Sequence, residues 1–213
     1  MKRRNFLQLG LGTLAVTGAA RAAELCLPTP AQTEGPFYPA KDQVDKDWDL
    51  TQVQGRRHAA EGEFLWITGQ VLDQHCQAVE GALVEIWQAC SSGKYNHPRD
   101  PNPTELDPHF QYWGRALTDA QGNYIFKTIK PGSYPAAPGW IRPPHIHYKV
   151  TKLGYHELTT QLYFADDALN DTDRILQSLP KAAQEQVIRP IQSTIIDGTP
   201  ADQVIFPLQI VKA

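Results

Sequence analysis

Residues 82–87 have the sequence Ala-Leu-Val-Glu-Ile-Trp, and this stretch sets the expectation for the fold. Successive side chains of a β-strand point to opposite faces, so Ala82, Val84 and Ile86 share one face and the other three residues share the second. The segment therefore predicts a β-strand, with Leu83, Glu85 and Trp87 on its second face.

Apolar segments of the same kind recur on both sides of this stretch, separated by turns rich in Gly, Pro, Asn and Asp. Strands are expected at residues 64–72, 115–118, 124–128, 145–151, 158–164, 194–196 and 204–211. The strands at 115–118 and 124–128 are expected to pair as a hairpin across the turn at 119–122. Many short strands joined by turns are typical of an all-β, single-domain β-sandwich.

Two long Pro-rich segments, 89–113 and 130–144, interrupt these strands. Loops of this length inside a compact domain are usually functional or disordered, and we expect these two to be active-site loops. Residues 166–189 are rich in Ala, Gln and Leu and predict one or two short helices near the C-terminus, with Pro180 at a first helical position.

The first residues have the pattern of an export signal. Arg3 and Arg4 precede Asn-Phe-Leu and a short apolar run, and a small-x-small cleavage pattern ends at Ala22. We expect residues 1–22 to be a twin-arginine signal peptide, with an ordinary Sec signal as the alternative, and the protein to be periplasmic or secreted. Residues 23–62 then form a Pro-rich N-terminal arm, and residues 63–213 the sandwich domain.

The charge of the chain argues against two classes of partner. The chain has 20 basic and 23 acidic residues, and removal of the signal would take away four basic residues and no acidic one. No cluster of Lys and Arg would remain. Nucleic acid and, after signal removal, membrane surfaces are therefore not expected as partners.

The three cysteines, Cys26, Cys76 and Cys90, allow one disulfide in an oxidising compartment. The sequence does not determine which two would pair. It contains no Cys-x-x-Cys spacing, which argues against a zinc–thiolate site.

The strongest local signal for chemistry is Arg142-Pro143-Pro144-His145-Ile146-His147. Two histidines that lie two residues apart on a strand point to the same face, within reach of one metal ion. The alternative is a polar strand face whose histidines bind nothing.

Each long loop also presents a tyrosine in a turn-like setting: Tyr95 follows Gly93-Lys94, and Tyr134 lies between Ser133 and Pro135. A phenolate is a hard anionic oxygen donor, and two phenolates with two imidazoles suit iron(III) better than zinc. A bound trivalent ion would remove the phenol protons far below the usual tyrosine pKa of about 10. The alternative for either tyrosine alone is an aromatic residue that packs a loop.

Seven segments of the chain occur in an order that is specific as a set, although each one alone is common. They are Gly69–Asp73, Gly81–Ala89, Gly93–Tyr95, Thr118–Tyr124, Phe126–Pro135, Arg142–His147 and Thr160–Phe164. With both tyrosines and the His-x-His pattern in sequence, this set resembles the intradiol ring-cleavage dioxygenases, within them the protocatechuate 3,4-dioxygenase type. The resemblance covers roughly residues 32–165.

The resemblance implies a ferric ion, Fe(3+), as cofactor. Its ligands would be Tyr95, Tyr134, His145 and His147. By the same resemblance, Tyr134 leaves the metal when substrate binds and then accepts a substrate proton, whereas Tyr95 stays bound.

The resemblance also implies two catalytic-site residues and a reaction. Arg142 would stabilise the negative charge that builds on the ring carbon attacked by O2, and Gln161 would belong to the substrate pocket. The implied reaction is cleavage of a catechol-type aromatic between its two hydroxyl-bearing carbons, which gives a cis,cis-muconate-type diacid. The partners are that substrate and O2. Substituted catechol, protocatechuate and hydroxyquinol stay open as substrates, and a homo-oligomer is compatible with the sequence.

The chain departs from the family in ways that leave subunit composition and substrate open. Protocatechuate enzymes of the family are built from two related chains and work in the cytoplasm, whereas this sequence is one chain with an export signal. Relatives of the catechol type carry a helical N-terminal dimerisation segment. The Pro-rich residues before the first strand do not fit such a segment.

Two other interpretations compete with an enzyme. A metal-free, transthyretin-like β-sandwich that binds small aromatic ligands would explain the strands and aromatic residues, but not the two tyrosines and two histidines in this arrangement. A copper or metal-storage protein is disfavoured because copper sites favour His with Cys or Met, and the only methionine is Met1.

Overall fold

The computed structural model describes residues 27–43 and 45–213. The expected signal peptide and Cys26 lie outside the described residues. Cys76 is disulfide-bonded, and Cys90 is a buried free thiol. Within the described ranges, no helix is long and apolar enough to cross a membrane.

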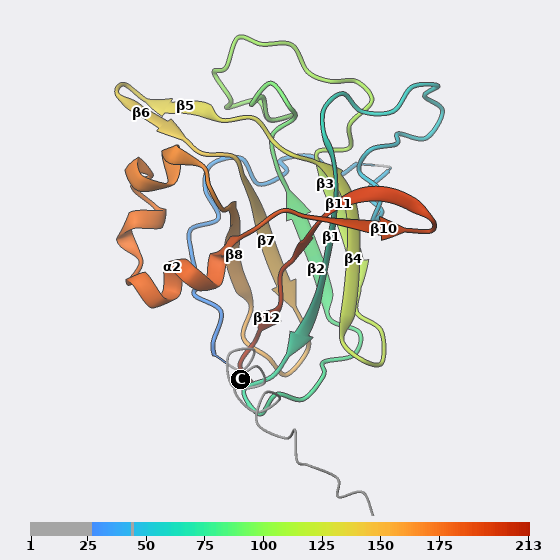
Figure 1. Cartoon of the computed structure of the whole chain (residues 1–213), viewed down its shortest axis with the longest axis vertical. Helices are drawn as coiled ribbons and strands as arrows, with labels where there is room; N and C mark the ends of the chain where they lie inside the picture. Colours follow the sequence, from blue (N-terminus) through green and yellow to red (C-terminus); the bar gives the residue numbers. More distant parts are fainter. Residues whose placement is uncertain (1–26, 44) are drawn as a thin grey trace, which may run out of the picture.

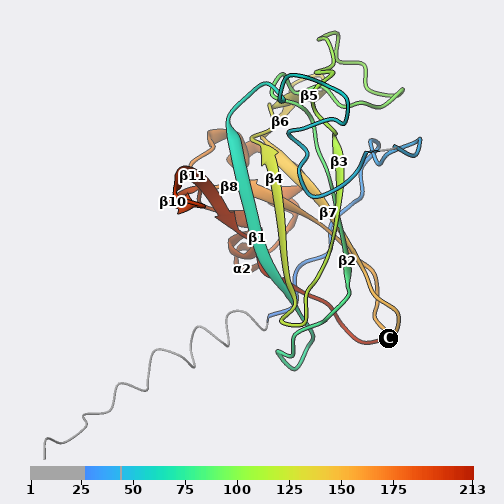
Figure 2. The same ribbon diagram turned by 90° about the vertical axis from the view of Figure 1, so that its right-hand side faces the viewer.

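Two sheets packed face to face confirm the expected all-β sandwich (Figure 1, Figure 2). In the first, β1 (Phe64–Leu72) pairs with β4 (Asn123–Ile129), β11 (Thr199–Ile205) and β12 (Leu208–Gln209), and β11 pairs with β10 (Gln192–Ile196). The second has β3 (Trp113–Leu117), β2 (Leu83–Trp87), β7 (His145–Thr151), β8 (Leu158–Phe164) and β9 (Ile188–Arg189) side by side in that order.

The expected hairpin between the strands at 115–118 and 124–128 is wrong. Both strands and the turn between them exist, but β3 pairs with β2, and β4 pairs with β1 in the other sheet. The chain therefore crosses from one layer to the other at residues 118–122. The turn itself is tight, because the Asp119 carboxylate accepts hydrogen bonds from the backbone N–H groups of Gln121 and Asn123. Such local turn chemistry does not determine which sheet each strand joins.

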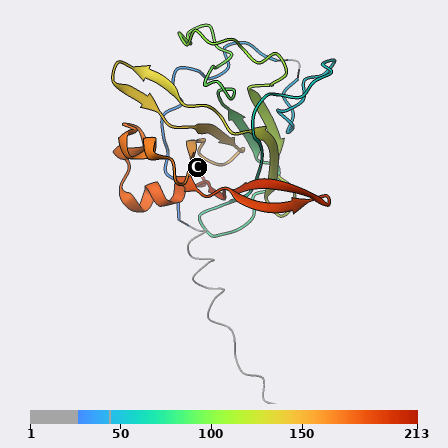
Figure 3. The same ribbon diagram turned by 45° about the horizontal axis from the view of Figure 1, so that its top comes forward.

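The segment 130–144, expected as a loop, contains a two-stranded sheet of β5 (Tyr134–Ala137) and β6 (Trp140–Arg142). In this hairpin Tyr134 and Arg142 are direct partners. The hairpin lies at one end of the sandwich, next to the expected helical segment (Figure 1, Figure 3). That segment contains η1 (Ala168–Thr172), η2 (Leu176–Ser178) and α2 (Lys181–Val187), and Pro180 is the N-cap of α2 instead of its first residue.

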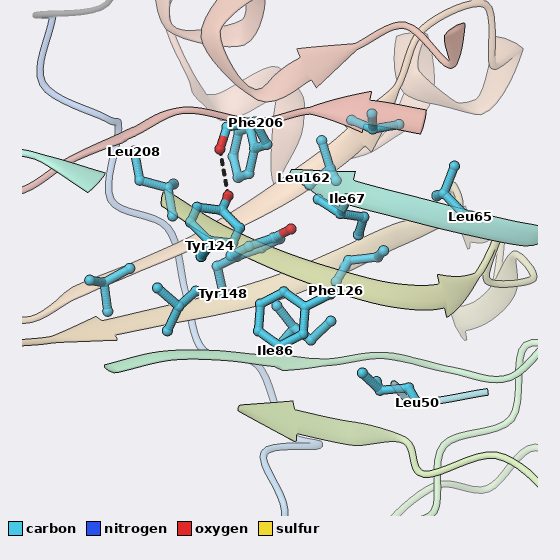
Figure 4. Packing of buried hydrophobic residues seen from close by; sticks show 14 of the residues in the cluster. Leu50, Leu65, Ile67, Ile86, Tyr124, Phe126, Tyr148, Leu162, Phe206 and Leu208 are labelled. Carbon is cyan, nitrogen blue, oxygen red and sulfur yellow. Dashed lines mark hydrogen bonds between the residues drawn. The ribbon is translucent and has the colours of Figure 1, made fainter. Parts of the chain in front are cut away.

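The main hydrophobic core fills the space between the two sheets (Figure 4). Ile67 and Phe126 from the first sheet and Ile86 and Tyr148 from the second are completely buried in it. Full burial of one such aliphatic or aromatic side chain contributes about 1.5–3 kcal/mol. The Tyr124 hydroxyl donates a hydrogen bond to the Phe206 carbonyl, which satisfies a polar atom inside this core (Figure 4).

A second aromatic cluster lies on the other face of the β3-β2-β7-β8 sheet. It consists of Phe37, Trp87, Ala89, Tyr95, Trp113 and Tyr134, with Tyr38 packed against them. Phe37 and Tyr38 come from the N-terminal segment, which has neither helix nor strand in residues 27–43 and 45–62. This outer face is therefore covered by the arm and the long loops, and the candidate site lies here.

Candidate metal centre and active site

Strand β7 places the two histidines by simple alternation. Ile146 and Tyr148 point into the main core, so His145 and His147 point to the outer face. His147 is the cross-strand neighbour of Trp87 on β2 and of Gln161 on β8. The Trp87 ring stacks on the His147 imidazole with centroids 4.8 Å apart and planes at 9°. Neighbouring strands thus hold the histidine ring in one orientation.

The two predicted tyrosines lie next to the two histidines. Ring centroids are 5.4 Å apart for Tyr95 and Tyr134, and 5.7 Å apart for Tyr134 and His145. They are 4.9 Å apart for His145 and His147, and 6.3 Å apart for His147 and Tyr95. The four rings form a closed circuit, and all four side chains are buried. The structure brings the predicted ligands together.

Two glycines explain how the tyrosine-bearing segments come so close. A Cβ on Gly93, whose φ is +80°, would lie 2.2 Å from the Ser133 carbonyl oxygen. A Cβ on Gly132 would lie 2.5 Å from the Gly93 nitrogen. Only glycine permits backbone contact this close, and it also tolerates the positive φ. Each glycine precedes its tyrosine by two residues, so the contact places Tyr95 beside Tyr134.

Arg142 lies beside this cluster and is tied to several fixed groups. Its Nε donates to Asp173 Oδ2 at 2.9 Å, and its NH2 group donates to Asp173 Oδ1, Gln161 Oε1 and Tyr163 Oη at 3.3, 2.9 and 3.0 Å. Its NH1 group lies 2.9 Å from His145 Nε2. Only 3% of the Arg142 surface is exposed. The structure therefore places both predicted catalytic-site residues, Arg142 and Gln161, in contact with each other and beside the predicted ligands.

The N-terminal arm contacts two residues of the site, Gln161 and His147. The Gln161 amide donates to the Thr33 carbonyl at 3.0 Å, and the Gln32 side chain accepts from the Gln161 backbone N–H at 2.9 Å. Gly35 has a φ of +73°, and a Cβ there would lie 3.3 Å from His147 Cε1. The arm backbone thus lies directly against the imidazole, and a side chain at Gly35 would press on that ring.

Burial controls the protonation of the four predicted ligands. It lowers the pKa of His145 and of His147 well below the ordinary value, and the nearby Arg142 charge lowers both further. Burial raises the pKa of Tyr95 and of Tyr134 above the ordinary tyrosine value, and for Tyr134 the Arg142 charge opposes this rise. Without an ion, neutral imidazoles and neutral phenols therefore face one another.

The arrangement of donor atoms fits iron(III). The hydrogen bond from His145 Nδ1 to the Pro143 carbonyl, 2.7 Å long, assigns the proton to Nδ1 and leaves a lone pair on Nε2. This Nε2 lies 3.3 Å from the Tyr95 hydroxyl and 2.9 Å from Arg142 NH1. His147 Nδ1 is buried and has no hydrogen-bond partner in the described part of the chain. No group of three or more His, Cys, Asp or Glu gathers among the described residues, so a metal site here depends on the tyrosines. Two phenol oxygens with two imidazole nitrogens suit a hard trivalent ion.

Several residues at the site were not singled out from the sequence, among them Tyr163, Trp87 and Asp173. Tyr163 lies two residues after Gln161 on β8, so strand alternation could have identified it. The same alternation places Trp87 on the outer face of β2. Asp173 lies between η1 and η2, and no local pattern distinguishes it from the other acidic residues there.

Comparisons with known proteins identify relatives of this chain. A family model described as "Dioxygenase" matches residues 33–209. The protocatechuate 3,4-dioxygenase beta chain of Burkholderia cepacia is 42% identical over 156 residues, which cover 72% of this chain and 66% of the relative. Catechol 1,2-dioxygenase of Candida albicans is 33% identical over 123 residues, which cover 52% of this chain and 39% of the relative.

A solved structure shows a similar fold over most of the chain. It is the dioxygenase domain of a dioxygenase carbohydrate-binding protein fusion from Streptomyces sp. SirexAA-E. It is 28% identical with a TM-score of 0.64, and the match covers 87% of this chain and 99% of that one. The chain spans 66% and 39% of the two curated relatives above. The family match over residues 33–209 and the similarity to the protocatechuate 3,4-dioxygenase beta chain show that the chain belongs to the intradiol ring-cleavage dioxygenase family.

Proposed function

We propose that the protein uses an iron(III) ion to cleave a catechol-type ring between its hydroxyl-bearing carbons, with O2 as the second substrate. The single observation that carries the proposal is the closed circuit of Tyr95, Tyr134, His145 and His147, all buried, with Arg142 in contact with it. The product would be a cis,cis-muconate-type diacid. When bound, iron(III) supplies a Lewis acid that holds the catechol as a dianion and makes the diol the reactive partner.

The two tyrosines have different surroundings, which supports different roles. Tyr95 packs against the Phe37 ring with centroids 4.7 Å apart and planes at 34°, and it is less exposed than Tyr134, so it would stay in place as a ligand. Tyr134 is the first residue of β5 and the cross-strand partner of Arg142 on β6, and the Arg142 charge favours the Tyr134 phenolate. Tyr134 would accept a proton from a substrate hydroxyl at its own phenolic oxygen.

Arg142 would present a fixed positive charge to the reacting ring. Its Nε and NH2 groups are bound to the protein, and its NH1 group faces the ligand cluster. A preorganised charge of this kind stabilises the negative charge that develops in the transition state without any reorganisation. Gln161 would hold the NH2 group from one side while the arm fixes the Gln161 amide.

The test is oxygen consumption by the iron-loaded protein with catechol, apolar substituted catechols, protocatechuate and hydroxyquinol, followed by identification of the product. A muconate-type diacid supports the proposal. A semialdehyde would place the cut beside the hydroxyls and reject it. Tyrosinate-to-iron(III) charge transfer should colour the loaded protein. A colourless protein that takes up no iron would instead favour the metal-free, ligand-binding sandwich.

We also propose that the protein is exported by the twin-arginine route. The basis is the Arg3-Arg4 pattern, and the disulfide at Cys76 supports it because disulfides persist in oxidising compartments. The test is cell fractionation of the full chain beside an Arg3→Lys/Arg4→Lys variant. Retention of both in the cytoplasm would reject export. Export of both would favour the Sec route.

A further inference from the structure

We propose that Asp173 is a positioning residue that fixes the orientation of the Arg142 guanidinium toward the reacting ring, an inference that rests on the function proposed above. Asp173 is completely buried and caps the C-terminal end of η1. Its two carboxylate oxygens accept from Arg142 Nε at 2.9 Å and from NH2 at 3.3 Å. A carboxylate that binds a guanidinium through both oxygens fixes the plane of the guanidinium as well as its position.

The remaining contacts of Arg142 show how the Asp173 carboxylate affects the orientation of the guanidinium. The NH2 group also donates to Gln161 Oε1 and Tyr163 Oη. With these partners, NH1 faces the predicted ligands and lies 2.9 Å from His145 Nε2. If the Asp173 carboxylate were absent, the Nε edge would have no partner among these contacts. The group could then rotate, and NH1 would no longer be held toward the site.

Asp173 is itself held rigidly. Its Oδ1 accepts from the backbone N–H groups of Ile175 at 3.1 Å and of Leu176 at 2.8 Å, at the start of η2. Leu176 is completely buried in the main core. The carboxylate is therefore attached to the core through the helical segment, which gives that segment a direct connection to the active site.

Asp173 also balances the charge of Arg142. The ion pair is nearly free of solvent, because the two side chains are 3% and 0% exposed. Such a pair has a structural role in any case, since removal of one partner leaves a buried, uncompensated charge. A test must therefore separate an effect on turnover from an effect on folding.

The first experiment compares Asp173→Asn and Asp173→Glu with the wild-type protein, all loaded with iron. For Asp173→Asn we expect kcat per bound iron to fall about 10-fold to 100-fold, the usual range for loss of a residue that orients a catalytic group, with KM nearly unchanged. Asp173→Glu should recover part of the rate because it restores a carboxylate. The tyrosinate–iron absorption band should stay at the wild-type position in both variants, because the ligands are intact.

Asp73→Asn is the matched control. Asp73 is also a buried carboxylate, 2% exposed, that accepts from the backbone N–H groups of His75 and Gln77 and pairs with Lys212 at 3.3 Å. It follows directly after β1, whose end lies at the opposite end of the sandwich from β5–β6 (Figure 1). Asp73→Asn should lower stability and leave kcat unchanged.

The second experiment combines Asp173→Asn with Arg142→Lys. If Asp173 acts through Arg142, its replacement should cause no further loss of kcat when Arg142 is already lysine. Fully additive losses in this cycle would overturn the proposal, and so would a wild-type kcat in Asp173→Asn. If Asp173→Asn does not fold, Asp173→Glu takes its place in the cycle with the same two outcomes. A wild-type protein that cleaves no catechol would refute the proposed function. An active wild-type protein whose Asp173 variants are equally active would refute only the role of Asp173.

Discussion

Replacement of Arg142 by lysine keeps a positive charge at the site but removes the planar fork that holds it. The arginine makes five polar contacts: two to Asp173 and one each to Gln161, Tyr163 and His145. A lysine ammonium is a point charge with three donors, so it can pair with Asp173 but cannot also present a charge toward His145. Arg142→Lys should therefore retain most of the charge balance and lose the positioned charge.

The two effects have different magnitudes. Loss of one preorganised charge in the transition state usually lowers turnover about 10²-fold to 10³-fold, or about 2.7–4 kcal/mol in activation free energy. In the free energy of unfolding, Arg142→Lys should lose about 1–3 kcal/mol for the hydrogen bonds to Gln161 and Tyr163. Arg142→Ala should lose about 3–5 kcal/mol, because it leaves the Asp173 carboxylate buried without its partner.

The assay measures kcat from oxygen uptake per bound iron, and stability from urea unfolding of the iron-free proteins. Both variants should bind iron and substrate and be slow, and the alanine variant should be the less stable of the two. A lysine variant with a kcat within about threefold of wild type would refute the argument that a fixed guanidinium is needed. Equal stabilities of the two variants would refute the argument from charge balance.

Three further predictions address other parts of the molecule. Tyr134→Phe should retain iron and lose about 10²-fold to 10⁴-fold in kcat, because it removes the base for the substrate proton; loss of iron would instead assign Tyr134 a structural role. Burial tends to raise the pKa of Asp73, but hydrogen bonds from backbone N–H groups and the charge of Lys212 outweigh burial and lower this pKa, so the ionised carboxylate stabilises the fold above its unfolded pKa of about 3.9. This stabilisation is lost as pH falls through the lower folded pKa, so Asp73→Asn should make the free energy of unfolding less dependent on pH below about pH 4. An unchanged acid-unfolding profile would contradict this role. Ile86→Ala should lower the free energy of unfolding by about 2–5 kcal/mol in urea titrations, because Ile86 is completely buried between the sheets, and a loss under about 1 kcal/mol would show that the cavity collapses.

Local alternation predicts the strands well wherever one face is buried. The strands expected at 64–72, 145–151 and 158–164 have the bounds of β1, β7 and β8. The pairing of β3 and β4 was not predictable, because the turn at Asp119 fits either a hairpin or a crossover between sheets. The β5–β6 hairpin was missed because its Pro and Gly residues are typical of a loop.

The same limit applies to the candidate site. The four expected ligands were found from residue type and spacing, and they lie together, although their role as ligands stays a prediction. The partners that hold Arg142 and Gln161 were not found. Asp173 is 31 residues from Arg142 in sequence and Gln32 is 129 residues from Gln161, and no local pattern reports a contact over such separations.

The arm is hydrogen-bonded to β8 and β12 at its described N-terminal end. The Thr29 hydroxyl accepts from the Gln209 backbone N–H at 2.8 Å, and the Pro30 carbonyl accepts from the Thr160 hydroxyl at 2.8 Å. Both contacts lie upstream of residue 33, where similarity to the family starts. A shortened protein cut just before β1 would keep every strand of the sandwich but expose the His147 ring to bulk water. The contacts between the arm and the sandwich therefore begin upstream of both the first strand and the region of family similarity, and a protein cut before β1 would lose them.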